Sequence, residues 1–141
     1  MLNSEILVTP LKKINTQGGD VLHALKSADE DFSGFGEIYF SRIEKNAIKA
    51  WKKHTKMNMN LIVPVGLVRF VFFDELNKNF TIYEIGESNY VRLFVPNNIW
   101  FGFQGIYDTA SLVTNISDIV HDPNEVERLM PKEINYNWEL I

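Results

Sequence analysis

The sequence contains no cysteine, which excludes disulfides, thiolate nucleophiles and cysteine-ligated zinc. No apolar run approaches the roughly 18 residues that a membrane-spanning helix requires, and we expect no membrane partner. Basic residues are not in excess, because the net charge is −4. Since non-specific binding to nucleic acid depends on positive charge, we expect no nucleic-acid partner. Histidine is scarce as well: His23, His54 and His121 are isolated from one another.

The chain has 141 residues, a length that is typical of one domain. We therefore predict a single domain over residues 1–141, with a core at about 36–120 and a short helix and tail at 121–141. Residues 1–5 lack the basic region and apolar run of a signal peptide. A cytoplasmic location is expected by default.

Short stretches of β-forming residues recur along the chain, and turn residues separate them. The stretches that we expect to form strands are 6–8, 21–25, 37–43, 48–54, 61–64, 67–73, 80–85, 90–95, 99–103 and 109–116. Their spacing of roughly 8–12 residues is typical of a β-sandwich or barrel. The tail differs, because Asp122 is a capping residue, Pro123 follows it and acidic residues come next. These signals predict one short helix over 122–129.

The segment 48–66 begins like a strand, yet it is unusually basic. Its charged or titratable members are Lys49, Lys52, Lys53, His54 and Lys56. An ionised ammonium loses its hydration when it is buried. The segment is therefore expected either to emerge into solvent or to line a cavity that holds an anion. Alternation along the strand predicts Lys52 and His54 on one face and Lys49 and Lys53 on the other.

A metal site is not expected. Metal-binding jelly rolls usually use two histidines one residue apart, and Lys52 stands where the partner of His54 would be. A lysine ammonium has no lone pair to offer a metal. We therefore predict no metal and no cofactor.

Several segments resemble one known family. They are 48–54, 63–66, 93–103, 108–110 and 134–138. Together they resemble the dTDP-4-dehydrorhamnose 3,5-epimerase family, the jelly-roll cupins of bacterial surface-sugar biosynthesis, and most of all its shorter sugar epimerase-like members. The resemblance runs from about residue 36 to 138. It implies an all-β jelly-roll (cupin-type) double-stranded β-helix or sandwich with a short C-terminal helix, and a dTDP-linked 4-keto-6-deoxy sugar as ligand.

The resemblance also implies site residues. The family's signature strand is Arg-Gly-Leu-His, with the histidine as general base. Aligned on Trp51, Lys49 takes the arginine place and Lys52 the histidine place, whereas a shift of two residues makes His54 the base. The implied catalytic residues are therefore His54 and Lys52. The implied substrate-binding residues are Lys49, Lys56, Asn60, Tyr90, Trp100 and Thr114.

Other family positions are changed. Thr114 stands where the family has a catalytic tyrosine, and Tyr39 or Tyr107 could replace that group if the fold brings one to the cavity. Phe101 stands in place of a histidine, and Met59 or Asn60 lies near the place of a lysine. The family dimerises through N-terminal strands, and the apolar residues 6–8 are consistent with a homodimer.

The family's chemistry removes a proton beside a ketone and returns one on the other face. Such a reaction needs a base near neutral pKa, a group that stabilises the enolate and an opposite-face acid. His54 would need no tuning, because free histidine titrates near ~6.5, whereas the pKa of Lys52 would have to fall far below its usual value.

Three hypotheses stay open. The first is an enzyme, either an epimerase or a 3,4-ketoisomerase, which shuttles a proton on one face only. The second is a degenerate sugar-nucleotide-binding or accessory module without turnover, which the simultaneous change of the family's histidine and tyrosine favours. The third is a structural sandwich whose basic strand contacts an acidic partner. The first hypothesis requires His54 to face the interior of the barrel within hydrogen-bond reach of a carboxylate, and it fails if His54 points to solvent.

Overall fold

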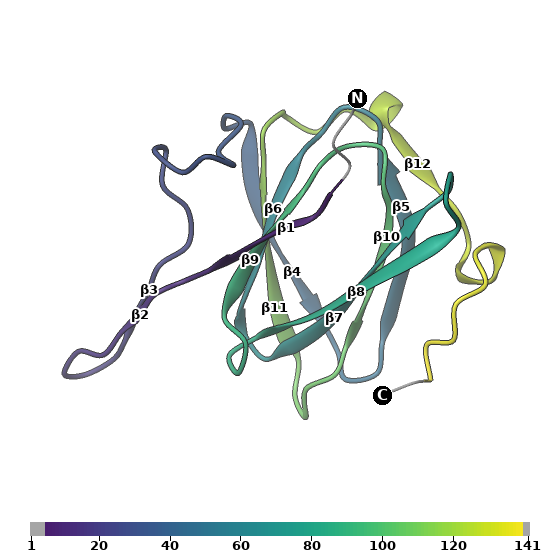
Figure 1. Ribbon diagram of the computed structural model, residues 1–141. Helices are drawn as coiled ribbons and strands as arrows, with labels where there is room; N and C mark the ends of the chain where they lie inside the picture. Colours follow the sequence, from purple (N-terminus) through teal and green to yellow (C-terminus); the bar gives the residue numbers. More distant parts are fainter. Residues whose placement is uncertain (1–4, 140–141) are drawn as a thin grey trace.

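Two five-stranded antiparallel sheets face each other in the computed structural model, which describes residues 5–139 (Figure 1). The first sheet has the order β1 (Leu7–Pro10), β9 (Val91–Val95), β6 (Met59–Val65), β11 (Ser111–Ser117) and β4 (Glu37–Ile43). The second has the order β12 (Val126–Arg128), β5 (Ile48–His54), β10 (Trp100–Gly105), β7 (Leu67–Asp74) and β8 (Asn79–Gly86). The all-β jelly-roll architecture predicted from the sequence is confirmed.

Apolar side chains from both sheets fill the space between them. Alternate residues of a strand point to the same face, so one face of each strand supplies the core. Phe70 is completely buried, and its ring centroid lies 5.4 Å from that of Phe103. Leu61 and Val113 of the first sheet belong to the same cluster as Phe70. Burial of each such side chain contributes about 1.5–3 kcal/mol.

A second apolar cluster covers the outer face of the second sheet. It comprises Trp51, Val71, Trp100, Ile134 and Trp138. The C-terminal tail supplies part of it, and the Trp51 ring lies 5.3 Å from the Trp138 ring. The Nε1 of Trp51 also donates a hydrogen bond to the carbonyl of Pro131 at 3.1 Å. These contacts hold the tail, with its 3-10 turn η2 (Pro131–Glu133), against β5.

An N-terminal arm projects from the sandwich (Figure 1). It is a two-stranded sheet of β2 (Lys13–Ile14) and β3 (Val21–Leu22), so the strand predicted at 21–25 is shorter than expected. The segment after the arm is fixed to the first sheet by Arg92. The Nη2 of this buried arginine donates to Asp31 at 2.6 Å, and its Nη1 donates to the carbonyl of Ala24 at 2.6 Å.

A β-bulge in β5 changes which of its side chains face the core. Phe101 of β10 pairs with Lys52, but Gly102 pairs with Ala50, which leaves Trp51 as the extra residue. A bulge inserts one residue and shifts the alternation. The prediction that Lys49 and Lys52 lie on opposite faces is therefore wrong: Lys49 and Lys52 both line the space between the sheets.

The two strands approach each other closely at this bulge. A Cβ added to Gly102 would lie 2.6 Å from the Cβ of Ala50, nearer than real Cβ atoms come. The absence of a side chain at Gly102 therefore lets β10 pass beside the bulged strand.

The tail contains less helix than the sequence predicts. Asp122 caps a single 3-10 turn, η1 (Pro123–Glu125), by accepting from the backbone of Asn124 at 2.9 Å. The next residues then form β12 and pair with the edge of β5. Because this pairing satisfies the backbone over a long sequence separation, it overrides the local helix signals. No helix within residues 5–139 has the length and apolarity needed to cross a membrane.

Candidate functional site

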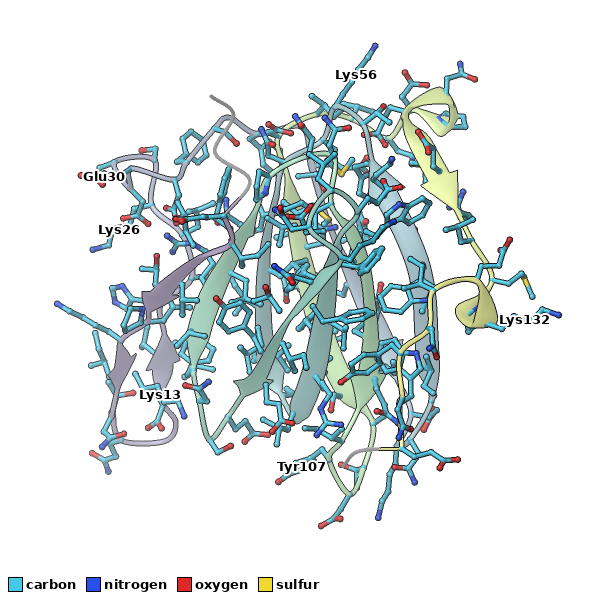
Figure 2. All side chains as sticks on the ribbon, turned by 45° about the vertical axis from the view of Figure 1, so that its right-hand side comes forward. Lys13, Lys26, Glu30, Lys56, Tyr107 and Lys132 are labelled. Atoms are coloured by element: carbon cyan, nitrogen blue, oxygen red, sulfur yellow. The ribbon has the colours of Figure 1, made fainter. Side chains whose placement is uncertain are left out.

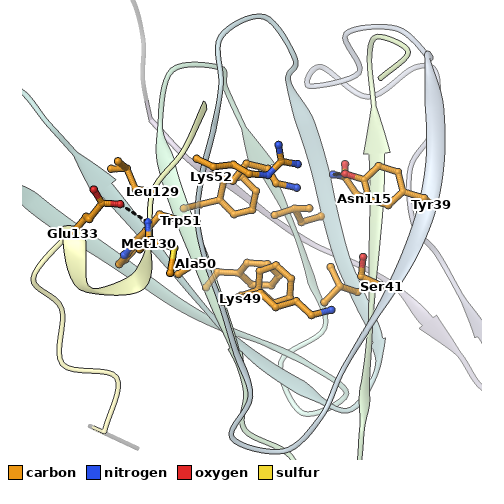
Figure 3. A pocket seen from close by; sticks show the side chains of 16 residues that line it. Tyr39, Ser41, Lys49, Ala50, Trp51, Lys52, Asn115, Leu129, Met130 and Glu133 are labelled. Carbon is orange, nitrogen blue, oxygen red and sulfur yellow. Dashed lines mark hydrogen bonds between the residues drawn. The ribbon is translucent and has the colours of Figure 1, made fainter. Parts of the chain in front are cut away.

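A cavity of about 610 Å³ lies between the two sheets (Figure 3). Its size falls within the roughly 300–1,000 Å³ that is typical of ligand pockets. Core side chains form its apolar part: Leu61, Phe70, Phe101, Phe103 and Val113. Strands of both sheets contribute to the wall, and the tail closes one side with Leu129, Met130 and Glu133. The cavity can therefore enclose a ligand rather than only touch it.

The polar groups of the cavity are mostly cationic or neutral. Lys49, Lys52 and Arg128 supply positive charge, and Tyr39, Ser41 and Asn115 supply neutral donors and acceptors. Arg128 lies opposite Lys52 in the pairing of β12 with β5. Glu133 is the acidic member of the lining, and its carboxylate accepts from the backbone of Met130. This balance suits an anionic ligand.

The lysines of β5 differ in their contacts. Lys53 faces away from the cavity, and its Nζ lies 3.1 Å from Glu75 and 3.5 Å from Glu127. Lys49 donates to the carbonyl of Arg42 at 2.7 Å. The Nζ of Lys52 has no hydrogen bond or ion pair with any residue of the described range 5–139. Burial lowers the pKa of Lys52, and the nearby Arg128 cation lowers it further.

His54 forms a buried pair with Glu125. The His54 Nδ1 lies 2.7 Å from Oε2 of Glu125, and the two side chains are 4% and 1% exposed. The other carboxylate oxygen accepts from the backbone of Met57 at 2.8 Å. Burial lowers the pKa of His54 although Glu125 acts in the opposite direction. The imidazole is therefore neutral, with its proton on Nδ1, and its Nε2 is buried without a hydrogen-bond partner.

His54 lies behind the cavity wall rather than in it. Its ring stacks on Phe101, with centroids 6.1 Å apart and planes 21° apart. Phe101 itself lines the cavity. The structure therefore places His54 within hydrogen-bond reach of a carboxylate and away from solvent, but Phe101 rather than His54 faces the cavity.

Tyr39 reaches the cavity from β4, in the sheet opposite β5. Its hydroxyl accepts a hydrogen bond from the Nδ2 of Asn115 at 2.8 Å. Figure 3 shows Tyr39 and Asn115 on one side of the cavity and Lys52 on the other. Burial raises the pKa of Tyr39, so the phenol keeps its proton and can donate it. Tyr107, the other tyrosine considered from the sequence, is 40% exposed and lies in a loop at one end of the sandwich (Figure 2).

Five of the residues predicted to bind substrate do not line the cavity. Tyr90 donates to the carbonyl of His23 at 2.9 Å, beside the N-terminal arm. Trp100 lies in the outer aromatic cluster, with the Nζ of Lys53 5.1 Å from its ring. Lys56 projects from one end of the molecule (Figure 2). The side chains of Tyr90, Trp100 and Lys56 therefore lie away from Lys49 and Lys52.

Asn60 and Thr114 are directed away from the cavity. The Asn60 side chain accepts from the Nε of Arg92 at 3.0 Å. Thr114 stands between Phe40 and Ile62 in the first sheet. Its neighbours Val113 and Asn115 line the cavity, and alternation therefore directs Thr114 outward.

Sequence reasoning missed Ser41, Asn115, Glu125 and Arg128. Alternation over 37–43 would have grouped Ser41 with Tyr39. Glu125 and Arg128 could not be assigned to the site from the sequence, because a helix was predicted where the structure has a turn and a strand. No group of three or more His, Cys, Asp or Glu side chains within residues 5–139 is placed to hold a metal ion.

No family model matches the chain. The crystal structure of a dTDP sugar isomerase from Desulfovibrio desulfuricans G20 is 35% identical, with a TM-score of 0.91, over 96% of this chain and 92% of that one.

Two curated proteins are also similar over most of their length. The spore coat polysaccharide biosynthesis protein SpsL of Bacillus subtilis is 22% identical over 94% of each chain. The probable low-salt glycan biosynthesis epimerase Agl13 of Haloferax volcanii is 26% identical over 84% of this chain and 80% of its own length. The chain belongs to the dTDP-4-dehydrorhamnose 3,5-epimerase-like family of sugar epimerases and isomerases.

Proposed function

We propose that this protein is a nucleotide-sugar epimerase that acts on a dTDP-linked 4-keto-6-deoxy sugar in the biosynthesis of a bacterial surface polysaccharide. The names of its relatives, a dTDP sugar isomerase, a spore coat polysaccharide protein and a glycan epimerase, support the substrate class and the process. The cationic lining of the cavity supports an anionic ligand.

One observation favours epimerisation over ketoisomerisation. Reactive groups belong to opposite sides of the cavity: Tyr39 lies on β4 of one sheet, whereas Lys52 and, behind Phe101, His54 lie on β5 of the other. Epimerisation removes a proton from one face of a carbon and returns one to the opposite face. A ketoisomerase that shuttles a proton on a single face would not need the tyrosine.

We assign roles on this basis. Lys49 and Arg128 bind the diphosphate, and Lys52 faces the keto group. His54, kept neutral by burial and oriented by Glu125, accepts the proton through its free Nε2, and Phe101 moves aside as the sugar enters. Catalytic contacts often tighten only when substrate binds. Tyr39 donates a proton from the opposite face. No metal or cofactor takes part in this scheme.

The proposed assembly is a cytoplasmic homodimer. The N-terminal arm exposes Ile14 and Val21, at 43% and 50%, and such apolar exposure on an arm suits contact with a second copy. The molar mass measured by light scattering during size-exclusion chromatography tests this, and a monomer at micromolar concentration would contradict it.

The function is tested by a thermal-shift panel of sugar nucleotides followed by exchange in D₂O. We expect dTDP-4-keto-6-deoxyglucose to stabilise the protein and to gain deuterium at carbons beside the ketone with inversion. Exchange without inversion, accompanied by movement of the keto group, would identify a ketoisomerase. Stabilisation with no exchange at all would identify a binding module.

A further inference from the structure

We propose that Lys52 is a covalent catalyst, whose amine condenses with the keto group of the bound sugar to form a Schiff base. This inference rests on the proposed function, because it requires a keto sugar in the cavity. It assigns a reaction step to the lysine, beyond the contact with the keto group described above.

The first argument is the state of the Lys52 side chain. It lines the cavity between the pairing partners Phe101 on β10 and Arg128 on β12. Within residues 5–139 its amine contacts no acceptor, whereas Lys49 donates to a carbonyl and Lys53 pairs with two carboxylates. A partly buried ammonium without a counter-ion is costly. The fold therefore keeps this amine available for reaction.

The second argument is electrostatic. Burial disfavours the ammonium form of Lys52, and Arg128 and Lys49 add like-charge repulsion that outweighs the attraction of Glu125. A lysine becomes nucleophilic when it is desolvated or placed beside another cation. The same cations disfavour a positively charged iminium relative to a neutral enamine, so they also assist loss of the neighbouring proton.

The reaction balances with water as its only co-reactant. The Nζ lone pair attacks the carbonyl carbon, and the amine proton passes to the oxygen to give a carbinolamine. The carbinolamine hydroxyl takes up a proton from solvent, the C–O bond breaks, water leaves and the C=N⁺ bond forms. His54 takes a proton from the adjacent carbon, whose C–H electrons become the C=C bond of an enamine. Tyr39 returns a proton to the opposite face, and water hydrolyses the iminium to release ketone, free Lys52 and the proton taken up at dehydration. Solvent then removes the proton from His54 and returns one to the Tyr39 phenolate.

The experiment uses the full-length protein with dTDP-4-keto-6-deoxyglucose and sodium cyanoborohydride, which reduces iminium ions. Intact-mass and peptide mass spectrometry should find an adduct on Lys52 with the mass of the sugar nucleotide less one oxygen atom. Lys53→Arg is the matched control, because Lys53 faces away from the cavity on the same strand, and it should keep the adduct.

A Lys52→Arg variant separates covalent chemistry from charge. Arginine retains the cation but cannot form the imine, so we expect the thermal shift with dTDP to persist while deuterium exchange falls more than about 100-fold. Deuterium exchange by the wild type without an adduct on Lys52, or exchange retained in Lys52→Arg, would refute the covalent step. Neither result would contradict the proposed epimerase function. Failure of the wild type to bind or exchange the sugar would instead refute the proposed function and the Schiff base together.

Discussion

The carboxylate of Glu125 lies 2.7 Å from the Nδ1 of His54, and both groups are buried. One carboxylate oxygen of Glu125 accepts from His54 and the other from the backbone of Met57, so Glu125→Gln should lose one of these bonds, because the NH₂ group that replaces an oxygen cannot accept. Since a buried hydrogen bond to a charged group contributes about 1.5–3 kcal/mol, we expect the free energy of unfolding to fall by that amount in urea denaturation. Glu127→Gln removes only a half-exposed ion pair with Lys53 and should change stability by less than about 1 kcal/mol. Equal losses in the two variants would contradict the pairing.

The His54 imidazole should also make stability depend on pH. Burial lowers its pKa in the folded protein, so below the unfolded value of about 6.5 the unfolded chain binds more protons than the folded one. The free energy of unfolding should therefore decrease as pH falls from about 6.5 towards the lower folded pKa, and this contribution should then level off. Urea unfolding of wild type and His54→Asn at several pH values measures the effect. Identical slopes in this window would show that His54 is not its source.

Tyr39 is expected to be the acid on the wall opposite Lys52. Tyr39→Phe removes only the hydroxyl and should slow inversion by roughly 10²–10⁴-fold, the usual contribution of a general acid. Exchange of the proton on the His54 side should be less affected. Tyr107→Phe, in an exposed loop, is the control, and ¹H NMR in D₂O follows both events. Inversion at the wild-type rate in Tyr39→Phe would remove this tyrosine from the mechanism.

Arg128 is expected to bind the diphosphate. Arg128→Gln should raise the Kd for dTDP about tenfold or more, since hydrogen bonds to charged groups contribute about 1.5–3 kcal/mol. Calorimetric titration at two salt concentrations should show a weaker salt dependence in the variant. Lys26→Gln, on the N-terminal segment far from the cavity lining, should bind like the wild type. An unchanged Kd in Arg128→Gln would place the diphosphate elsewhere.

Gly102 is expected to be required where β10 passes the bulge. Gly102→Ala should lower the free energy of unfolding by about 1–3 kcal/mol, the usual cost of overpacking. Ala50→Gly removes the Cβ that the new methyl would meet at 2.6 Å, so the double mutant should recover part of the loss. Strictly additive effects would show that the two positions do not compete for space.

Most strands could be predicted from the sequence because their signals are local. Residues 37–43 and 48–54 match β4 and β5 at both ends, since β-forming residues fill each stretch and turn residues bound it. The strand β12 could not be predicted in this way. The signals at Asp122 and Pro123 are local helix signals, whereas the partner of β12 is a strand more than seventy residues earlier in the chain.

The site was harder to predict than the fold. The basic strand was correctly singled out as one that could line a cavity, and Lys49 and Lys52 do line it. The faces of β5 on which Lys49 and Lys52 lie were predicted wrongly. The extra residue at Trp51 shifts the alternation, and the residue composition of the strand does not reveal such a bulge. Glu125 could not be found from sequence spacing, since 71 positions separate it from His54.

The position of β12 affects how the site is assembled during synthesis. Every other strand of the two large sheets ends by Ser117, and an emerging chain can therefore form most of the sandwich before residues 122–128 leave the ribosome. Until they do, His54 lacks its carboxylate and Lys52 lacks the neighbouring arginine. The surroundings of Lys52 and His54 are therefore complete only after β12 has paired with β5, and the same step brings Arg128 and Leu129 to the cavity wall.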